Sequence, residues 1–188
     1  MPRVPSTLQV AHVEEMLHRI SDDLSLITDY PLSLADAETE VATTRAAGTG
    51  GIHISFRLGI VEGEKRHHGC LLVPLADAVT FACGLMMLPE GVIASKRGES
   101  ELDDVTKDAL LEVGNFVTGA TEEALRALGV GDETVVFEGC QGVRPDVRPA
   151  LIYDEGDELV VGRARATLGD YPPGEVLLMV PEAGLPSD

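Results

Sequence analysis

The stretch "SELDDVTKDALLEVGNFVTGATEEAL", residues 100–125, decides the fold that we expect for this chain of 188 residues. Ser100 and Asp103 are candidate N-caps, acidic residues follow in the first turns, and Gly129 stands where the pattern stops. These features predict one long helix. On a helical wheel it has a polar side and an apolar side, and the residues expected in the core are Leu102, Val105, Ala109, Leu110, Val113, Phe116, Val117, Ala120, Ala124 and Leu128.

Four residues of the polar side form one stripe along the predicted helix: Asp108, Glu112, Asn115 and Gly119. Asn is a mediocre helix former, and a Gly inside a helix costs about 1 kcal/mol relative to Ala. Packing between helices would explain a glycine on the core side, but the wheel places Gly119 on the polar side. The stripe therefore predicts a surface that another molecule approaches closely.

The same stretch resembles the helix of the CheC/CheX/FliY phosphatases of bacterial and archaeal chemotaxis. Their pattern is an Asp or Ser, three residues, a Glu, two residues, an Asn, and typically a Gly four further on. Asp108, Glu112, Asn115 and Gly119 match this pattern in register. The sequence shows one copy of the motif, and in this respect it looks most like CheX.

The resemblance covers roughly residues 52–128. Upstream of the motif, "HHGCLLVPLADAVTFACGLMM" at 67–87 looks like the strand and helix that precede the motif in the family. The family pattern also expects a proline a little over twenty residues after the Asn. Here that position falls near "FEGCQG" at 137–142, and the nearest prolines, Pro145 and Pro149, come later.

The resemblance implies a phosphatase that hydrolyses the aspartyl phosphate of a CheY-like response regulator, in chemotaxis or related two-component signalling. It implies catalytic roles for Glu112 and Asn115 and binding roles for Asp108 and Gly119. The chain would need no cofactor of its own, because the regulator supplies Mg²⁺, and a CheX-like chain would be expected to form a homodimer. Two alternatives stay open: a non-catalytic regulator-binding adaptor of the same fold, and an unrelated α+β domain that binds a small molecule.

Outside the motif, the sequence predicts an α+β fold of the CheC/CheX type, with a mostly antiparallel sheet covered by long helices. A helix is expected over 5–27, with Ser6 or Thr7 as its cap, and a second, apolar helix over 76–88 should stop at Pro89. Strands are expected over 39–46 and 52–61, and a polar turn followed by a third strand over 62–75. Further strand-like runs separated by turns are expected over 133–139, 148–168 and 174–181.

Two short turns complete this prediction. "GTGG" at 48–51 and "DEGD" at 154–157 are both expected to close β-hairpins. We expect a single CheC/CheX-like domain over 1–181 and a disordered tail over 182–188.

Composition narrows the possible partners. A net charge of −18, from 32 acidic and 14 basic residues, disfavours binding to a nucleic-acid backbone.

No metal site is expected. Cys70, Cys83 and Cys140 lack CxxC spacing and are expected to be buried thiols. The adjacent His67 and His68 should point to opposite faces of a strand. The N-terminus has no uninterrupted apolar stretch of signal-peptide length, and no segment reaches the roughly 18 apolar residues of a membrane span. A cytoplasmic protein without a membrane partner is therefore expected.

Overall fold

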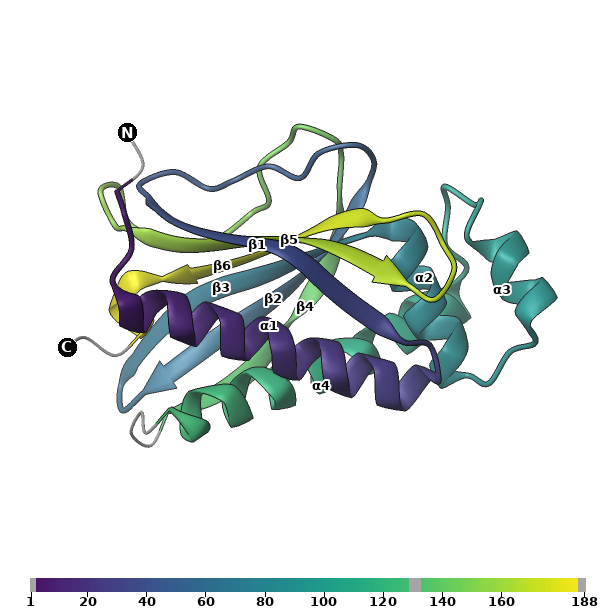
Figure 1. Ribbon diagram of the computed structural model, residues 1–188, viewed down its shortest axis with the longest axis horizontal. Helices are drawn as coiled ribbons and strands as arrows, with labels where there is room; N and C mark the ends of the chain where they lie inside the picture. Colours follow the sequence, from purple (N-terminus) through teal and green to yellow (C-terminus); the bar gives the residue numbers. More distant parts are fainter. Residues whose placement is uncertain (1–2, 129–132, 186–188) are drawn as a thin grey trace.

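The computed structural model describes residues 3–128 and 133–185. Their elements are, in chain order, α1 (Thr7–Thr28), β1 (Leu32–Ala42), β2 (His53–Glu62), β3 (Lys65–Pro74), α2 (Leu75–Leu85), α3 (Glu90–Lys96), α4 (Asp104–Ala127), β4 (Thr134–Val143), β5 (Leu159–Leu168), β6 (Gly174–Pro181) and a 3-10 turn, η1 (Glu182–Gly184) (Figure 1).

The strands form one six-stranded sheet in the order β1-β5-β6-β3-β2-β4. Every pair of neighbouring strands is antiparallel. β2 and β3 form a hairpin in which Glu62 pairs with Lys65, as the polar turn in the sequence predicts. The predicted α+β fold with a mostly antiparallel sheet is therefore confirmed.

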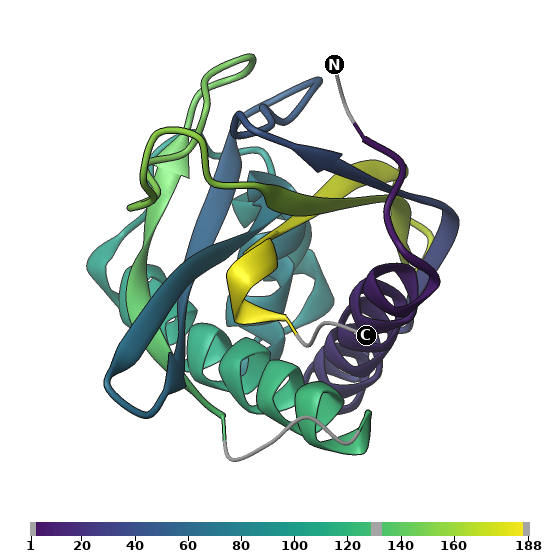
Figure 2. The same ribbon diagram turned by 90° about the vertical axis from the view of Figure 1, so that its left-hand side faces the viewer.

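The two faces of the sheet are covered differently. α1 and α4 lie side by side across one face, and α2 packs against both helices (Figures 1 and 2). The main core lies between these helices and the sheet, where Phe56, Leu58 and Ile60 of β2 are buried. The opposite face is covered by the connecting segments 43–52 and 144–158, which enclose a second, smaller apolar cluster.

α1 begins at the capping box that the sequence suggests. Ser6 Oγ accepts a hydrogen bond from the Gln9 backbone N–H at 3.1 Å, and Gln9 Oε1 accepts one from the Ser6 N–H at 2.9 Å. These two bonds satisfy two of the backbone donors that a helix leaves open at its start. One side of α1 is buried, and it carries apolar residues at helical spacing, including Val13, Leu17 and Leu24.

The hairpin predicted around "GTGG" is wrong. β1 begins at Leu32 and pairs with β5 at one edge of the sheet, whereas β2 pairs with β3 and β4 near the other edge. The segment 43–52 is therefore a long connection across one face of the sheet, from β1 to β2, and not a tight turn. The hairpin predicted around "DEGD" is wrong for the same reason, because 144–158 connects β4 to the distant β5.

The helix predicted over 76–88 is confirmed as α2, which ends before Pro89, at Leu85. The prediction missed α3, a separate short helix whose N-cap residue is Pro89. Arg97, just after α3, holds the helix against the body of the protein. Its Nη2 donates to Asp77 Oδ1 at 3.0 Å, and its guanidinium lies 3.7 Å from the centre of the Tyr171 ring.

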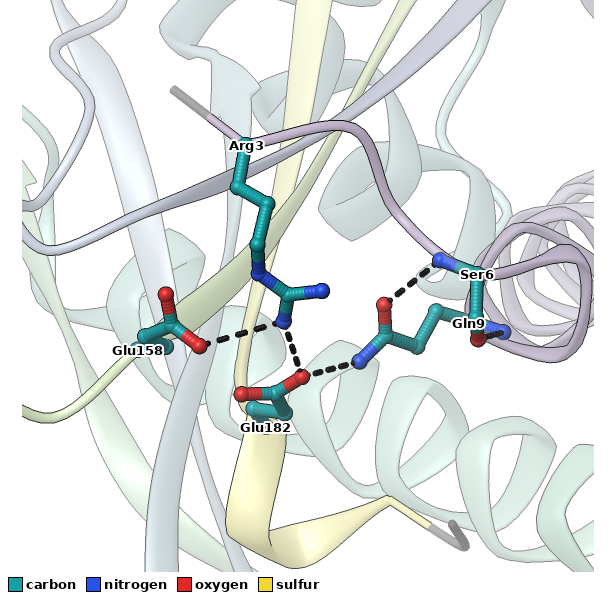
Figure 3. Close-up of polar contacts among 5 residues, drawn as sticks. All are labelled: Arg3, Ser6, Gln9, Glu158 and Glu182. Atoms are coloured by element: carbon teal, nitrogen blue, oxygen red, sulfur yellow. Dashed lines mark hydrogen bonds and ion pairs between the residues drawn. The ribbon is translucent and has the colours of Figure 1, made fainter. Parts of the chain in front are cut away.

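The N-terminal and C-terminal segments are joined by the polar network in Figure 3. Arg3 donates to Glu158 at 3.1 Å and also to Glu182, which in turn accepts from Gln9 of α1. Leu185 is buried beyond this network. The predicted disordered tail is therefore wrong for residues 182–185, and 186–188 lie outside the described residues.

The cysteines follow the prediction in part. Cys70 and Cys83 are buried, and Cys140 is half-buried. Burial raises the pKa of the Cys70 thiol to about 12.

Over residues 3–128 and 133–185, no helix is long and apolar enough to cross a membrane.

Candidate functional site

The start of α4 is fixed by Asp103. Its Oδ1 accepts a hydrogen bond from the Thr106 backbone N–H at 2.7 Å, so Asp103, and not Ser100, is the N-cap. Lys96 Nζ lies 2.5 Å from the other carboxylate oxygen. The hydrogen bonds from Lys96 and Thr106 hold the pKa of Asp103 well below its usual range. Asp103 thereby joins the start of α4 to the end of α3.

A glycine fixes how closely α4 approaches the sheet. Gly114 faces β4, and a Cβ built on it would lie 2.2 Å from Phe137 Cζ. Next to it, the buried hydroxyl of Thr118 donates to the Gly114 carbonyl at 2.8 Å, which satisfies a polar group inside the core. Sequence reasoning missed Gly114, because a helical wheel shows neither where Phe137 lies nor how near it comes.

The buried side of α4 is rotated relative to the prediction by roughly 60°. Val105 and Phe116, predicted in the core, are 65% and 38% exposed. Gly114, Thr118 and Leu125 take the buried positions instead, because α4 leans toward β4 as well as toward α1 and α2. The polar stripe still faces away from the protein.

All four residues of the predicted stripe, Asp108, Glu112, Asn115 and Gly119, are exposed on α4. Asn115 Nδ2 donates a hydrogen bond to Glu112 Oε2 at 3.3 Å. A Cβ built on Gly119 meets nothing within 4 Å. Packing within the described chain therefore gives no reason for a glycine at this position.

Glu122, which lies beside the stripe on the wheel, has a structural role. Its Oε2 accepts a hydrogen bond from the Val135 backbone N–H at 2.8 Å, at the start of β4, and its other oxygen pairs with Arg126. It therefore does not join the stripe.

Apolar side chains flank the stripe. Leu111, on the side opposite Phe116, is 43% exposed. Beside Leu111, a groove of about 380 Å³ opens between α4, β4 and the start of α2. Leu75, Leu102 and Cys140 are among the residues that line it. The sequence contains one sign of this surface: Leu111 is apolar, yet on the helical wheel it lies outside the apolar side of the helix.

The chemistry available at the stripe is polar and acidic. A carboxamide both donates and accepts hydrogen bonds and does not titrate, so Asn115 can orient a water molecule without acting as a base. Asp104, Asp108, Glu112 and Glu123 make the exposed side of α4 negative. A free phosphate would be repelled here, unless its charge is balanced by a cation. In the described part of the chain, no three His, Cys, Asp or Glu side chains gather closely enough to hold a metal ion.

The antiparallel sheet with two long helices on one face is a fold shared with solved structures of the chemotaxis proteins FliY and CheX. FliY of Thermotoga maritima superposes with a TM-score of 0.70 at 13% identity, over 96% of this chain and 93% of that chain. CheX of Desulfovibrio desulfuricans superposes with a TM-score of 0.57 at 15% identity, over 90% of this chain and 97% of that chain.

The middle domain of FliM from H. pylori has the same fold, with a TM-score of 0.64 at 12% identity over 96% of this chain and 95% of that chain. By sequence, no family model and no curated protein matches the chain. At these identities the structural likeness establishes the fold, which is the one that the motif predicts.

Proposed function

We propose that this protein is a phosphatase that hydrolyses the aspartyl phosphate of a CheY-like response regulator. The observation that carries the proposal is the exposed, hydrogen-bonded pair Glu112–Asn115 on the outer side of α4, in a fold shared with CheX and FliY. The open position of Gly119 one turn further supports a close approach by a partner.

In this proposal Asn115 orients the attacking water. Its Nδ2 is engaged by Glu112, which leaves Oδ1 free to accept a hydrogen from a water molecule. The water oxygen attacks phosphorus in line with the leaving carboxylate, the bond between phosphorus and the aspartyl oxygen breaks, and inorganic phosphate and the free aspartate remain. Because an aspartyl phosphate is already reactive, positioning the water is the main contribution required of the enzyme.

Glu112 would recognise the regulator. Its carboxylate can accept a charge-assisted hydrogen bond from a lysine beside the regulator's aspartyl phosphate. Asp108, one turn earlier, would dock against the same surface. The Mg²⁺ belongs to the regulator, and with that lysine it balances the phosphoryl charge. The acidic stripe would therefore accept a phosphoryl group that arrives with its cations and reject free phosphate.

A regulator-binding adaptor without turnover is the second candidate. The likeness to the FliM middle domain favours it, since H. pylori FliM has also been crystallised in complex with FliG. A further reason is the segment "FEGCQG" at 137–142, which lies in β4 and carries no proline where the family pattern expects one. An adaptor would bind the same partner, but its effect would not depend on Asn115.

The test follows the loss of phosphate from candidate response regulators in Mg²⁺, with wild-type protein and with Asn115→Ala. We expect wild type to accelerate the decay of one regulator, and Asn115→Ala to reduce the acceleration about a hundredfold, because the water is no longer positioned. Asp22→Ala is the matched control, since Asp22 lies on the exposed side of α1. Binding of a regulator without faster decay would establish the adaptor instead, and equal acceleration by wild type and Asn115→Ala would contradict the role proposed for Asn115.

A further inference from the structure

A second polar site lies on the face of the sheet opposite the helices. A cavity of about 180 Å³ opens there between strands β2, β3 and β4 and the two connecting segments that cover them. Its polar lining consists of Arg45, Arg57, His68 and Glu138, and one wall is formed by residues 150–152. The phosphatase proposal makes no use of this cavity.

Arg57 is the unusual member of this site. Over residues 3–128 and 133–185 it makes no ion pair and its side chain makes no hydrogen bond, although it is half-buried and its Nε is fully enclosed. Arg45 is held in place at one end, because its Nη1 donates to the Pro149 carbonyl at 2.7 Å and its guanidinium lies 5.6 Å from the centre of the Tyr153 ring. Its Nε is also enclosed without a partner. Enclosed donors without acceptors are costly.

Glu138, the one carboxylate among the described residues that line the cavity, is engaged by other groups. Glu138 Oε2 accepts from His68 Nδ1 at 2.7 Å, and Glu138 Oε1 lies 3.4 Å from Arg66 Nη1. The described lining of the cavity thus holds two arginines, Arg45 and Arg57, and a carboxylate that also pairs with Arg66 outside the lining. The cavity keeps a positive charge on a protein whose net charge is −18.

The backbone is shaped around Arg57. The pairing of β2 with β4 shifts between Phe56 and Leu58, so a bulge in β4 lies opposite Arg57. Gly139, in this bulge, has a φ of 91°, and a Cβ built on it would lie 3.2 Å from Arg57 Nη2. A bulge redirects side chains locally, and a glycine in it removes the atom that would crowd the guanidinium.

We infer that this cavity binds a small oxyanion, a phosphate or a carboxylate, with Arg57 as its principal ligand. Guanidinium is the side chain best suited to these groups, because its donors match two oxygens at once. The Nη groups of Arg57 have no partner among the described residues and, unlike its enclosed Nε, are open to the cavity, so they can donate to a ligand there. The site is independent of the phosphatase stripe, which lies on the opposite side of the sheet.

The test titrates the protein with inorganic phosphate and, separately, with acetate, in a buffer free of other oxyanions, while the NMR signals of the arginine Nε–H groups are followed. We expect the Arg57 signal to shift and saturate with at least one of the two probes. Saturation with phosphate alone identifies a phosphate site, and saturation with acetate alone identifies a carboxylate site. Affinity is then measured by calorimetry on the variants.

Three variants decide the inference. Arg57→Gln should weaken binding about tenfold or more, because it removes the charge and the paired donors. Arg165→Gln removes one positive charge from an exposed pair with Asp36 and should leave binding unchanged. Glu138→Gln should tighten binding, because it neutralises the only carboxylate among the described lining residues. The absence of saturation with both probes, or equal losses in Arg57→Gln and Arg165→Gln, would overturn the inference.

Discussion

The two long helices, α1 and α4, lie side by side on the same face of the sheet, yet their exposed sides differ. On α1, exposed polar side chains four residues apart pair within the helix: Arg19 with Glu15 at 2.8 Å, and His18 with Asp22 at 3.3 Å. Such pairs four residues apart stabilise a helix by a few tenths of a kcal/mol. The exposed side of α1 is therefore explained by the helix itself.

The exposed side of α4 is not explained in this way. It carries Asn115 and Gly119, two poor helix formers, and no contact within the described residues compensates for Gly119. It also exposes three large apolar side chains, Val105, Leu111 and Phe116, whereas α1 exposes only Leu26 among its residues. Residues that cost stability and serve no internal packing are the ones to examine for a partner.

The largest effect that separates the helices should come from their glutamates. Glu112→Gln removes the charge that we assign to the regulator's lysine, and we expect regulator dephosphorylation to fall between about tenfold and a hundredfold. Glu15→Gln on α1 should leave the rate unchanged, since Glu15 pairs with Arg19. Single-turnover rates at saturating and limiting enzyme would separate binding from turnover. Equal rates for the two variants would remove Glu112 from the site.

The two glycines of α4 should respond in opposite directions. Gly114→Ala places a methyl group 2.2 Å from Phe137 Cζ, and we expect it to lower the free energy of unfolding by about 1–3 kcal/mol. Gly119→Ala has open space and should raise that free energy by up to about 1 kcal/mol, while it slows regulator dephosphorylation. Urea unfolding and the phosphate-loss assay measure the two effects. A faster or unchanged rate in Gly119→Ala would show that no partner approaches there.

The exposed leucines allow a smaller, matched comparison. Leu111→Asp should weaken regulator binding about tenfold, because it puts a charge beside the apolar groove at the edge of the stripe. Leu26→Asp changes a leucine on α1 that is 82% exposed and should have no effect on binding. Calorimetry with the regulator measures both affinities. If both variants bind as tightly as wild type, the groove lies outside the interface.

The smallest effect should be a pH dependence that distinguishes the two N-caps. The pKa of Asp103 is lowered in the folded protein, so its stabilising contribution is complete above the unfolded pKa of about 3.9 and is lost as pH falls through the lower folded value. The difference in stability between wild type and Asp103→Ala should therefore shrink toward low pH. Ser6→Ala, at the cap of α1, should cost the same at every pH, because a hydroxyl does not titrate there. Urea unfolding over a pH series measures both differences.

Much of the fold could be predicted from local patterns. The long helices and the β2–β3 hairpin follow from capping residues, periodicity and turns, which act over a few residues. The same signals placed the N-cap of α4 at Ser100 or Asp103, and the structure shows that it is Asp103. The position of β1 could not be predicted, because a strand's partner depends on contacts between segments far apart in the chain. β1 is joined to β2 by "GTGG", yet it pairs with β5.

The candidate site shows the same division. The residues Asp108, Glu112, Asn115 and Gly119 could be placed on one exposed stripe from their spacing alone. The residues that flank the stripe could not be predicted. The apolar character of Val105 and Phe116 predicts that they lie in the core, but both are exposed. Which side of a helix is buried depends on its neighbours, and in α4 the buried side includes Gly114, which lies too close to Phe137 for any side chain.

The sequence by itself determined that a long amphipathic helix carries an acidic and amide stripe on its outer side, because helical geometry fixes which residues share a face. Only the tertiary structure decided how closely that helix lies against β4, which apolar side chains remain exposed beside it, and that Arg45 and Arg57 meet on the opposite face of the sheet. These are consequences of packing between distant segments, and a local pattern carries no record of them.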